Sequence, residues 1–303
     1  MKRDRSSIGP LAILAALVVV IWFLPELLGR KAFFYFDLAG VHLPQRAFVA
    51  ESLKRGVFPF WCPLKACGFP LFAEGQTGIL YPFNLLSLVL PVWWSNNIIT
   101  VVHILIAFFG TYLYIRRQGL SDAAGCIAGL SYSMSSFMLA HHIHPPMFQA
   151  FCWLGFVMIA AETLPEKADR GILISAVFLG FALIAGHTQA FVIVVAAFFA
   201  RLLIFAIDAR GLKDAARLIG YGLVALAAVL LIFAPYVVAQ VEFVLRSYRA
   251  KLTGGEFFLV GSLEPRALFN LFIRGLTGDL YDASFTCGGE AIWEGRLYFG
   301  IVP

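Results

Sequence analysis

Long apolar runs are the feature that most constrains this chain. Several of them reach about 20 residues, which is enough to cross a hydrocarbon core about 30 Å thick. The 303-residue sequence is 60% hydrophobic and only 14% charged, whereas soluble domains carry roughly 25% charged residues. A transmembrane β-barrel would be built from short alternating segments, and the sequence has no such pattern. The sequence therefore predicts an all-α polytopic membrane protein.

Seven transmembrane helices are predicted, at residues 8–28, 96–115, 121–140, 146–162, 169–186, 188–207 and 215–238. The first follows the basic start MKRDR and is not followed by a small-x-small cleavage site, so we expect an uncleaved anchor. Residues 1–303 are treated as one transmembrane domain with two long external segments, 29–95 and 240–303. The apolar run Ile79–Pro91 is only 13 residues long, so we expect it to be re-entrant or interfacial rather than spanning.

Basic residues between the predicted spans define an orientation. One set of loops holds Arg116, Arg117, Lys167, Arg170, Arg210, Lys213 and Arg217, whereas the short turns His141–Pro146 and His187–Gln189 contain no Lys or Arg. The positive-inside rule then places the N-terminus in the cytoplasm and both long segments outside. Arg201 lies within a predicted span but near its inner end, where its side chain can extend to the membrane surface. The net charge of +5 lies mostly in these loops, so it does not indicate a nucleic-acid-binding surface.

Two further expectations concern the external segments. The stretch HLPQRAFVAESLKRG, which ends at Gly56, is typical of an amphipathic helix lying on the membrane. The final YFGIVP is apolar and resembles the beginning of another span, so we expect the chain to be the N-terminal portion of a longer protein.

Asp37 is the first candidate for chemistry. It stands among aromatic residues in FFYFDLAGVHLPQ, directly after the first predicted span. A carboxylate there can act as a general base or orient an acceptor hydroxyl. The alternative is a helix cap or a solvated surface acid.

The remaining polar candidates also fall at predicted external span ends. His141, His142 and His144 invite a metal site, but no partner at a suggestive spacing supports one, and contact with lipid phosphate or water is the alternative. The turn GHTQ places His187 and Gln189 either as substrate contacts or as groups that satisfy exposed helix ends.

The last predicted span is followed by Glu242, Arg246 and Arg249. The two arginines can clamp a phosphate, since guanidinium binds its oxygens bidentately, or they can contact anionic lipid headgroups. Cys62, Cys67 and Cys287 fall on the external side, where a disulfide among them can form.

The first external segment holds the stretch FDLAGVHLPQ followed by GVFPFWCPLKACGFPLFAEGQTGILYPFNLL. This stretch is the most specific part of a resemblance between the chain and the bacterial YfhO-type membrane protein family. Its matching residues are Asp37, Trp61, Pro63, Gly68, Pro70, Leu71, Gln76, Gly78, Tyr81, Pro82 and Asn84. Further matches are His144, GHTQA at 186–190, the VEFVLRSYR run with Glu242, and the ending GGEAIWEGRLYFGIVP. The resemblance covers nearly the whole chain.

This family is similar in architecture to GT-C class glycosyltransferases, which use polyprenyl-phosphate-linked sugars and place a catalytic carboxylate in the first external loop. The resemblance implies a GT-C-like fold, a catalytic role for Asp37 and a polyprenyl-phosphate sugar donor in the bacterial inner membrane. The substrate-binding residues that we expect are His144, His187, Gln189, Glu242, Arg246 and Arg249. No cofactor is expected, and the absence of an Asp-x-Asp pair means that a divalent metal is not implied. The alternative is a non-enzymatic membrane protein that binds or translocates lipid-linked glycans.

Overall fold

Helices form every regular element in the part of the chain that the structure, a computed structural model, describes: residues 8–207 and 211–251. Apart from these helices there is one isolated antiparallel bridge within that part, between Cys62 and Phe69. The all-α prediction is thus confirmed for these residues. Most of the predicted second external segment lies outside the described residues.

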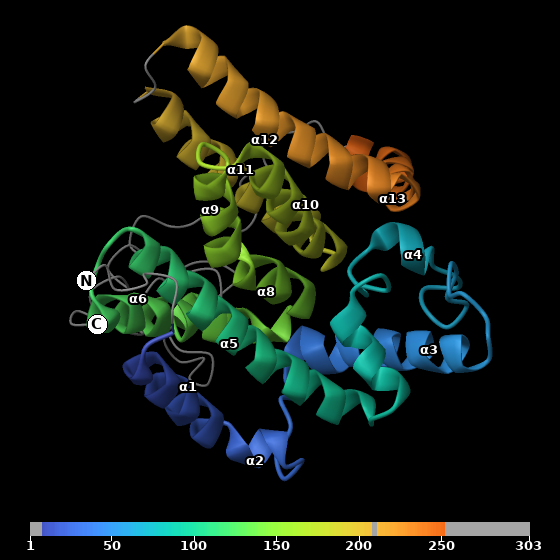
Figure 1. Ribbon diagram of the computed structural model, residues 1–303. Helices are drawn as coiled ribbons and strands as arrows, with labels where there is room; N and C mark the ends of the chain where they lie inside the picture. The colour runs from blue at the N-terminus through green and yellow to red at the C-terminus, as the bar shows by residue number, and fades with distance from the viewer. Residues whose placement is uncertain (1–7, 208–210, 252–303) are drawn as a thin grey trace, which may run out of the picture.

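The elements before the first long helix are short. They are α1 (Pro10–Trp22), α2 (Leu24–Leu27), the π-helical turn η1 (Leu38–His42), α3 (Leu43–Lys54), α4 (Leu71–Glu74) and the 3-10 helix η2 (Pro82–Leu88). The bundle follows with α5 (Val92–Arg117), α6 (Asp122–Ser133), α7 (Ser136–Ala140), η3 (His141–Ile143), α8 (Pro145–Cys152), α9 (Leu154–Thr163), α10 (Ala168–Ile184), α11 (Thr188–Ile207), α12 (Leu212–Ile232), α13 (Ala234–Arg246) and η4 (Tyr248–Lys251). Figure 1 shows their arrangement.

Five helical segments among the described residues are long and apolar enough to cross a membrane: Val92–Arg117, Asp122–Ile143, Pro145–Thr163, Thr188–Ile207 and Leu212–Ile232. These are the helices of a membrane-embedded protein, and each overlaps one predicted span. The other two predicted spans, 8–28 and 169–186, correspond to shorter helices, α1 with 13 residues and α10 with 17. Seven spans therefore remain a prediction, while five are supported by length and composition.

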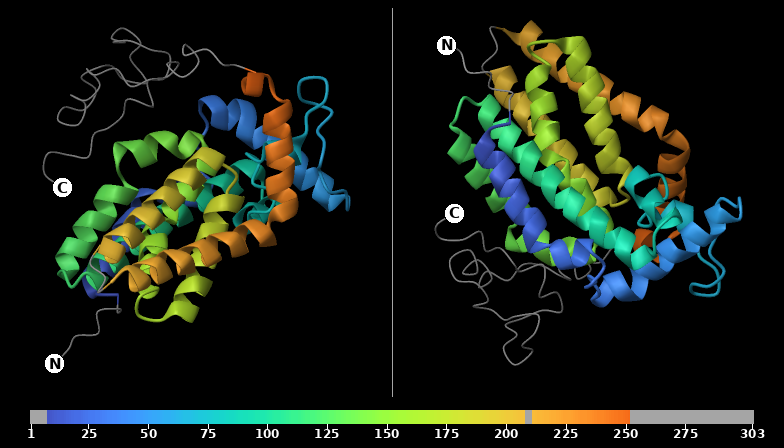
Figure 2. Two further views of the ribbon diagram at one scale, coloured as in Figure 1. Left: turned by 90° about the horizontal axis from the view of Figure 1, so that it is seen from above. Right: turned by 60° about the horizontal axis from the view of Figure 1, so that its bottom comes forward.

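The core of the bundle is built around α8 and α9. Of the residues in the Pro145–Thr163 window, 67% are buried, against 17% in Leu212–Ile232. The latter helix therefore lies at the periphery, where its apolar side chains suit lipid. It ends at Ile232, and α13 leaves in a different direction because Pro235 in its first turn cannot continue the preceding hydrogen-bond ladder (Figure 2).

Small residues let α5 approach its neighbours. A Cβ on Gly155 of α9 would lie 2.3 Å from the backbone carbon of Gly110 in α5. Gly129 of α6 faces α5 in the same way, since a Cβ there would lie 2.9 Å from the carbonyl oxygen of Phe108. Residues 121–140 are rich in Gly, Ala and Ser, a composition that favours such close helix packing.

The first loop segment is anchored to the bundle by buried polar groups. The stretch HLPQRAFVAESLKRG forms α3 and ends at Gly56, whose φ of +73° suits glycine, as predicted. One feature differs from a helix lying on the membrane surface: Arg46 is only 4% exposed, and its Nη1 donates to Asn96 Oδ1 at 2.8 Å. Burial lowers the pKa of Arg46 to about 10, so its guanidinium stays charged at neutral pH.

A second anchor runs through Tyr81. Trp153 Nε1 donates to the Tyr81 hydroxyl at 2.8 Å, and that hydroxyl lies 2.5 Å from His103 Nε2. His103 Nδ1 must donate to the carbonyl oxygen of Ile99, 2.7 Å away, so Nε2 is the acceptor for Tyr81. Every donor in this buried chain has an acceptor, which fixes the Tyr-Pro segment of the loop against α5 and α9.

Candidate functional site

Asp37 stands on an unusual piece of backbone. Phe36, immediately before it, has a φ of +39°, and the π-helical turn η1 begins immediately after it. Both conformations are uncommon for ordinary residues and are concentrated at functional sites in proteins. Leu38 is fully buried against Leu43 and Ile143, while the Asp37 side chain remains 53% exposed. The local structure therefore holds the carboxylate at a defined position open to solvent.

His144 is the partner of this carboxylate. Its Nε2 lies 3.2 Å from Asp37 Oδ2, although the two residues are 107 positions apart in the chain. His144 sits directly before α8, where Pro145 and Pro146 fix the start of the helix. The structure thus brings together two residues that the sequence had singled out separately.

A second histidine extends this contact inward. His144 Nδ1 lies 3.2 Å from Nδ1 of His141, whose side chain is fully buried. Only one of the two facing nitrogens can carry the proton between them. When a neutral His144 donates from Nε2 to Asp37, its Nδ1 accepts a hydrogen bond from Nδ1 of His141. When His144 is an imidazolium, both of its nitrogens donate, so Nδ1 of His141 accepts and the His141 proton is on Nε2. The three side chains therefore form one connected hydrogen-bonded group.

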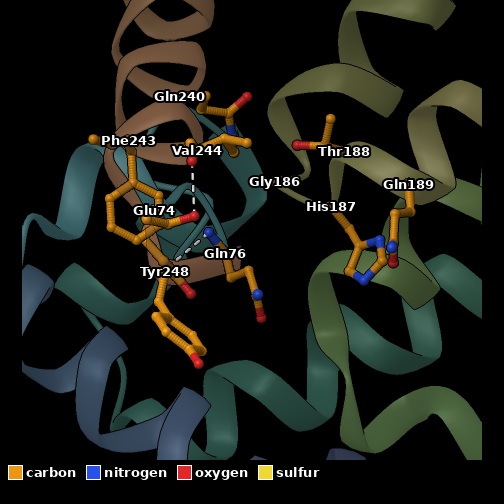
Figure 3. A pocket seen from close by; sticks show the side chains of 12 residues that line it. Glu74, Gln76, Gly186, His187, Thr188, Gln189, Gln240, Phe243, Val244 and Tyr248 are labelled. Atoms are coloured by element: carbon orange, nitrogen blue, oxygen red, sulfur yellow. Dashed lines mark hydrogen bonds between the residues drawn. The ribbon is translucent and has the colours of Figure 1, made fainter. Parts of the chain in front are cut away.

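An open cavity of about 430 Å³ lies between the first loop, the start of α11 and α13 (Figure 3). Its size falls in the range of small-molecule sites. The lining residues come from three parts of the chain: Ala73, Glu74, Gln76, Gly186, His187, Thr188, Gln189, Gln240, Phe243, Val244, Ser247 and Tyr248. Two of them, His187 and Gln189, were predicted to contact substrate.

Glycines allow two walls of the cavity to meet. Gly186 has a φ of +103°, and a Cβ on it would lie 2.3 Å from the carbonyl oxygen of Gly75. Gly75 itself has a φ of +85°, and a Cβ there would lie 2.0 Å from Gln240 Nε2. The Tyr236 hydroxyl donates to the Gly75 carbonyl at 3.2 Å. The Glu-Gly-Gln turn of the first loop, the GHTQ turn and α13 are thereby packed into one frame.

His187 satisfies a helix end, one of the two interpretations left open by the sequence, while its contact with substrate stays a prediction. Its Nδ1 accepts from the backbone N–H of Ala190 at 3.1 Å, so it caps the start of α11. It also lines the cavity. Burial lowers the pKa of His187, and the charge of His144 lowers it further, so His144 lies within electrostatic reach of His187.

Glu74 is a cavity residue that sequence reasoning missed. Its Oε2 accepts from the backbone N–H of Gln76 at 3.1 Å. Burial raises its pKa, although the charge of Lys65 and the Gln76 hydrogen bond act in the opposite direction. The residue stands inside the quoted loop motif, but its surroundings come from α13, far away in the sequence, and no local pattern marks it.

Glu242 and Arg246 lie on a different face of α13. Arg246 Nη2 pairs with Glu242 Oε1 at 2.6 Å, and the side chains are 79% and 56% exposed. The cavity is lined by the face that carries Gln240, Phe243, Val244 and Ser247. The structure therefore does not bring Glu242 or Arg246 into the cavity. Arg249 lies in η4, and its side chain is outside the described part.

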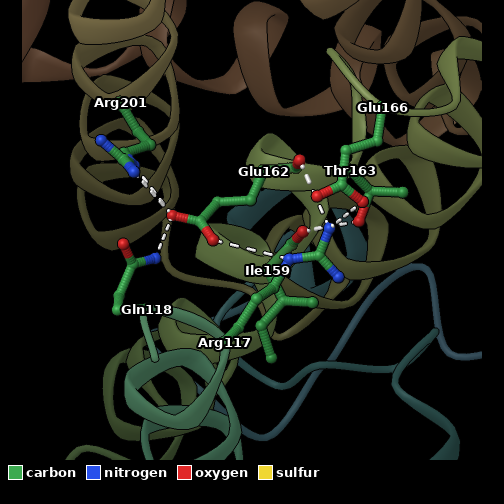
Figure 4. Close-up of polar contacts among 7 residues, drawn as sticks. All are labelled: Arg117, Gln118, Ile159, Glu162, Thr163, Glu166 and Arg201. Atoms are coloured by element: carbon green, nitrogen blue, oxygen red, sulfur yellow. Dashed lines mark hydrogen bonds and ion pairs between the residues drawn. The ribbon is translucent and has the colours of Figure 1, made fainter. Parts of the chain in front are cut away.

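A separate polar cluster closes the opposite ends of the same helices (Figure 4). Glu162, at 7% exposed, accepts from Nη2 of Arg201 at 2.7 Å and from Nε2 of Gln118, while Arg117 Nε lies 3.5 Å away. Arg117 also pairs with Glu166 at 2.6 Å. Arg201 was expected to extend to the membrane surface, but it turns to this buried carboxylate instead. The charges balance within the cluster, so it ties α5, α9 and α11 together.

The described residues contain no group arranged to hold a metal ion and no disulfide. No group of three or more His, Cys, Asp or Glu side chains is arranged there to hold a metal ion. Cys62 and Cys67 are both free thiols, and Cys287 lies outside those ranges.

Comparisons with protein-family models, with curated proteins and with solved structures found no match to this chain.

Proposed function

We propose that this protein is a membrane glycosyltransferase that moves a sugar from a polyprenyl-phosphate donor to an acceptor on the external face of the bacterial inner membrane. The N-terminus would then be cytoplasmic and the fold GT-C-like. The proposal uses the resemblance of the first loop and the positions of its polar residues.

The observation that carries the proposal is the contact between Asp37 and His144. A carboxylate that is half-exposed and held 3.2 Å from a histidine can accept a proton from a bound hydroxyl. His187, which lines the cavity, lies within electrostatic reach of this pair, since the charge of His144 acts on it.

The chemistry is a displacement at the anomeric carbon. The acceptor oxygen forms a bond to that carbon, the bond from the carbon to the phosphate oxygen breaks, and the phosphate leaves on its lipid. Asp37 takes the proton of the acceptor hydroxyl, and the hydrogen bond with His144 holds the carboxylate in position. No metal ion is required for these roles.

A second function shares the same cavity. A membrane protein that binds or translocates lipid-linked glycans would also need a polar cavity beside the bilayer, and the cavity supports that role equally. Substitution of Asp37 distinguishes the two functions, because only a transferase needs a basic carboxylate at this position.

The test compares two Asp→Asn substitutions in purified protein with a polyprenyl-phosphate sugar donor. Asp37→Asn should lower turnover by roughly 10²–10⁴-fold, the usual effect of losing a general base. Asp214→Asn is the matched control, since Asp214 is 54% exposed and also lies 3.2 Å from a basic partner, Arg217. It should leave turnover unchanged.

Melting temperature is measured alongside, because an amide retains the shape of the carboxylate and should not unfold the protein. Turnover of Asp37→Asn within about threefold of wild type, far from the general-base range, would rule out catalysis by Asp37 and favour the glycan-binding alternative.

A further inference from the structure

The charge of the cavity wall restricts what can bind there. Its lining includes one carboxylate, Glu74, and, among the described residues, no lysine or arginine. Burial keeps the pKa of His187 below its ordinary value, so this side chain is neutral at pH 7. The cation that acts on Glu74 is Lys65, whose Nζ lies 4.0 Å from the centre of the Phe69 ring, outside the lining. A phosphate in this cavity would face the Glu74 carboxylate and no cation among the described residues of the wall.

The hydrogen-bonding groups of the wall suit hydroxyls. Gln76, Gln189 and Gln240 each present an amide that both donates and accepts, and no hydrogen bond to another described residue engages these three amides. Gln240 is only 8% exposed, so its side chain is held between α13 and the Gly75 turn. Sugar hydroxyls also donate and accept, and an amide can pair with two of them at once.

The wall formed by α13 and η4 adds apolar surface. Phe243 and Tyr248 stand on the side of the cavity opposite His187 and Gln189 (Figure 3). Aromatic rings pack well against the C–H faces of a ring-shaped polar molecule, while amides and carboxylates bind its rim. Glu74 lies on the same side as these aromatic rings, as Figure 3 shows.

We infer that this cavity is a subsite for a neutral sugar ring, that it excludes phosphate, and that Glu74 is its specificity-determining residue. The inference deepens the proposed function by separating the two ends of the donor: the sugar or the acceptor occupies the cavity, and the phosphate binds elsewhere. A carboxylate makes stronger hydrogen bonds to hydroxyls than a neutral group does, and it repels an anion of similar size.

Direct binding tests this without any transfer reaction. Methyl glycosides of glucose, galactose and N-acetylglucosamine are titrated against the protein in lipid nanodiscs, and binding is followed by saturation-transfer NMR with empty nanodiscs as the background. At least one glycoside should bind, and inorganic phosphate at equal concentration should not displace it. Glu74→Gln should raise the dissociation constant of that glycoside roughly tenfold, the effect of weakening a charge-assisted hydrogen bond.

Glu51→Gln is the matched control, since Glu51 is 57% exposed on α3 and pairs with Arg55 at 2.8 Å. It should leave the dissociation constant unchanged. Displacement of the glycoside by phosphate, or no glycoside signal above empty nanodiscs, would overturn the inference, and neither result depends on how a variant folds. An unchanged dissociation constant in a folded Glu74→Gln variant would remove Glu74 from the subsite.

The two proposals can fail separately. If Asp37→Asn leaves turnover intact while glycosides still bind, the transferase mechanism is wrong and the sugar subsite stands. If Asp37→Asn abolishes turnover while no glycoside binds, the transferase stands and the cavity has another role.

Discussion

His42 is a buried histidine one turn from a buried arginine. It is 4% exposed, and its pKa is lowered to about 3, first by burial and then by the charge of Arg46, with smaller effects from His144, Lys65 and His187. The folded protein therefore keeps His42 neutral over a pH range in which the unfolded chain, with a pKa of 6.5, binds a proton. The folding contribution of this side chain is complete above pH 6.5 and is lost progressively as the pH falls toward 3.

We predict that the protein loses stability between pH 6.5 and pH 5, and that His42→Gln removes part of that loss. One pKa unit corresponds to 1.36 kcal/mol, so His42 should account for about 2 kcal/mol at pH 5. The measurement is the melting temperature of both proteins across this pH range. His187 acts in the same direction and Glu74 in the opposite one, so the difference between the two curves is the informative quantity. Parallel curves would contradict the assignment to His42.

The sequence patterns marked members of the site but not the contacts between them. Asp37 and His144 were each marked by motifs and by position at span ends, yet only the folded chain brings them to 3.2 Å. Glu74 was not predicted, because a carboxylate in a loop is common and its burial by α13 cannot be read from the local sequence. The burial of Arg46 was not predicted for the same reason, since its buried partners Asn96 and Gln149 lie about 50 and 103 residues away in the sequence.

The crossing of α5 and α9 depends on the absence of two side chains. A Cβ on Gly155 would lie 2.3 Å from the Gly110 carbon and 2.4 Å from the Thr111 nitrogen. Backbone atoms cannot move aside as a flexible side chain can, so the two helices would have to separate. These helices belong to the most buried part of the bundle, and α9 carries Glu162 near its C-terminal end.

We predict that Gly155→Ala destabilises the protein by roughly 1–3 kcal/mol, the range for overpacking a closely packed site. Gly220→Ala on α12 is the control, because a Cβ there meets nothing within 4 Å. Alanine favours a helix over glycine by about 1 kcal/mol, so the control should be neutral or slightly stabilising. Thermal unfolding in detergent measures both. Equal melting temperatures for the two variants would mean that the helices can separate without cost.

Helix positions were predicted better than helix continuity. The span 188–207 coincides with α11, and 96–115 falls inside α5. The predicted span 121–140 is instead interrupted after Ser133, because Ser135 Oγ accepts from the backbone N–H of Met138 and starts a new helix, α7. Apolar periodicity cannot reveal such an interruption, since the residues on both sides are equally apolar.

The height of the whole bundle bears on how many helices cross the membrane. The backbone N–H of Gly9 donates to the Tyr112 hydroxyl at 2.9 Å, and Trp94 Nε1 donates to the Leu27 carbonyl at 2.8 Å. Between Trp94 and Tyr112, α5 rises about 27 Å, so α1 and α2 together follow it over nearly the thickness of a bilayer core. In the same way, α10 begins after the Glu162 cluster and ends beside His187, at the opposite end of the bundle. We therefore expect both short segments to cross, giving seven spans.

Labelling of single-cysteine variants with a membrane-impermeant maleimide tests this topology. The exposed native Cys67 should react in intact cells, because it lies in the first external segment. A cysteine at position 116 should react only after the membrane is permeabilised. For α10, a cysteine at position 167 should be protected and one at position 188 should react, because the helix between them crosses the bilayer.

Each label tests one part of the orientation. Reaction of the cysteine at position 116 in intact cells would invert the orientation and move Asp37 and its histidines to the cytoplasmic face. Equal reactivity at positions 167 and 188 would mean that α10 does not cross, which would leave α11 and α12 in the opposite orientation. The cavity residues of α13 would then no longer share a side of the membrane with Asp37, although the structure holds them in one frame around Gly75 and Gly186. That frame is the physical reason to expect protection at 167 and reaction at 188.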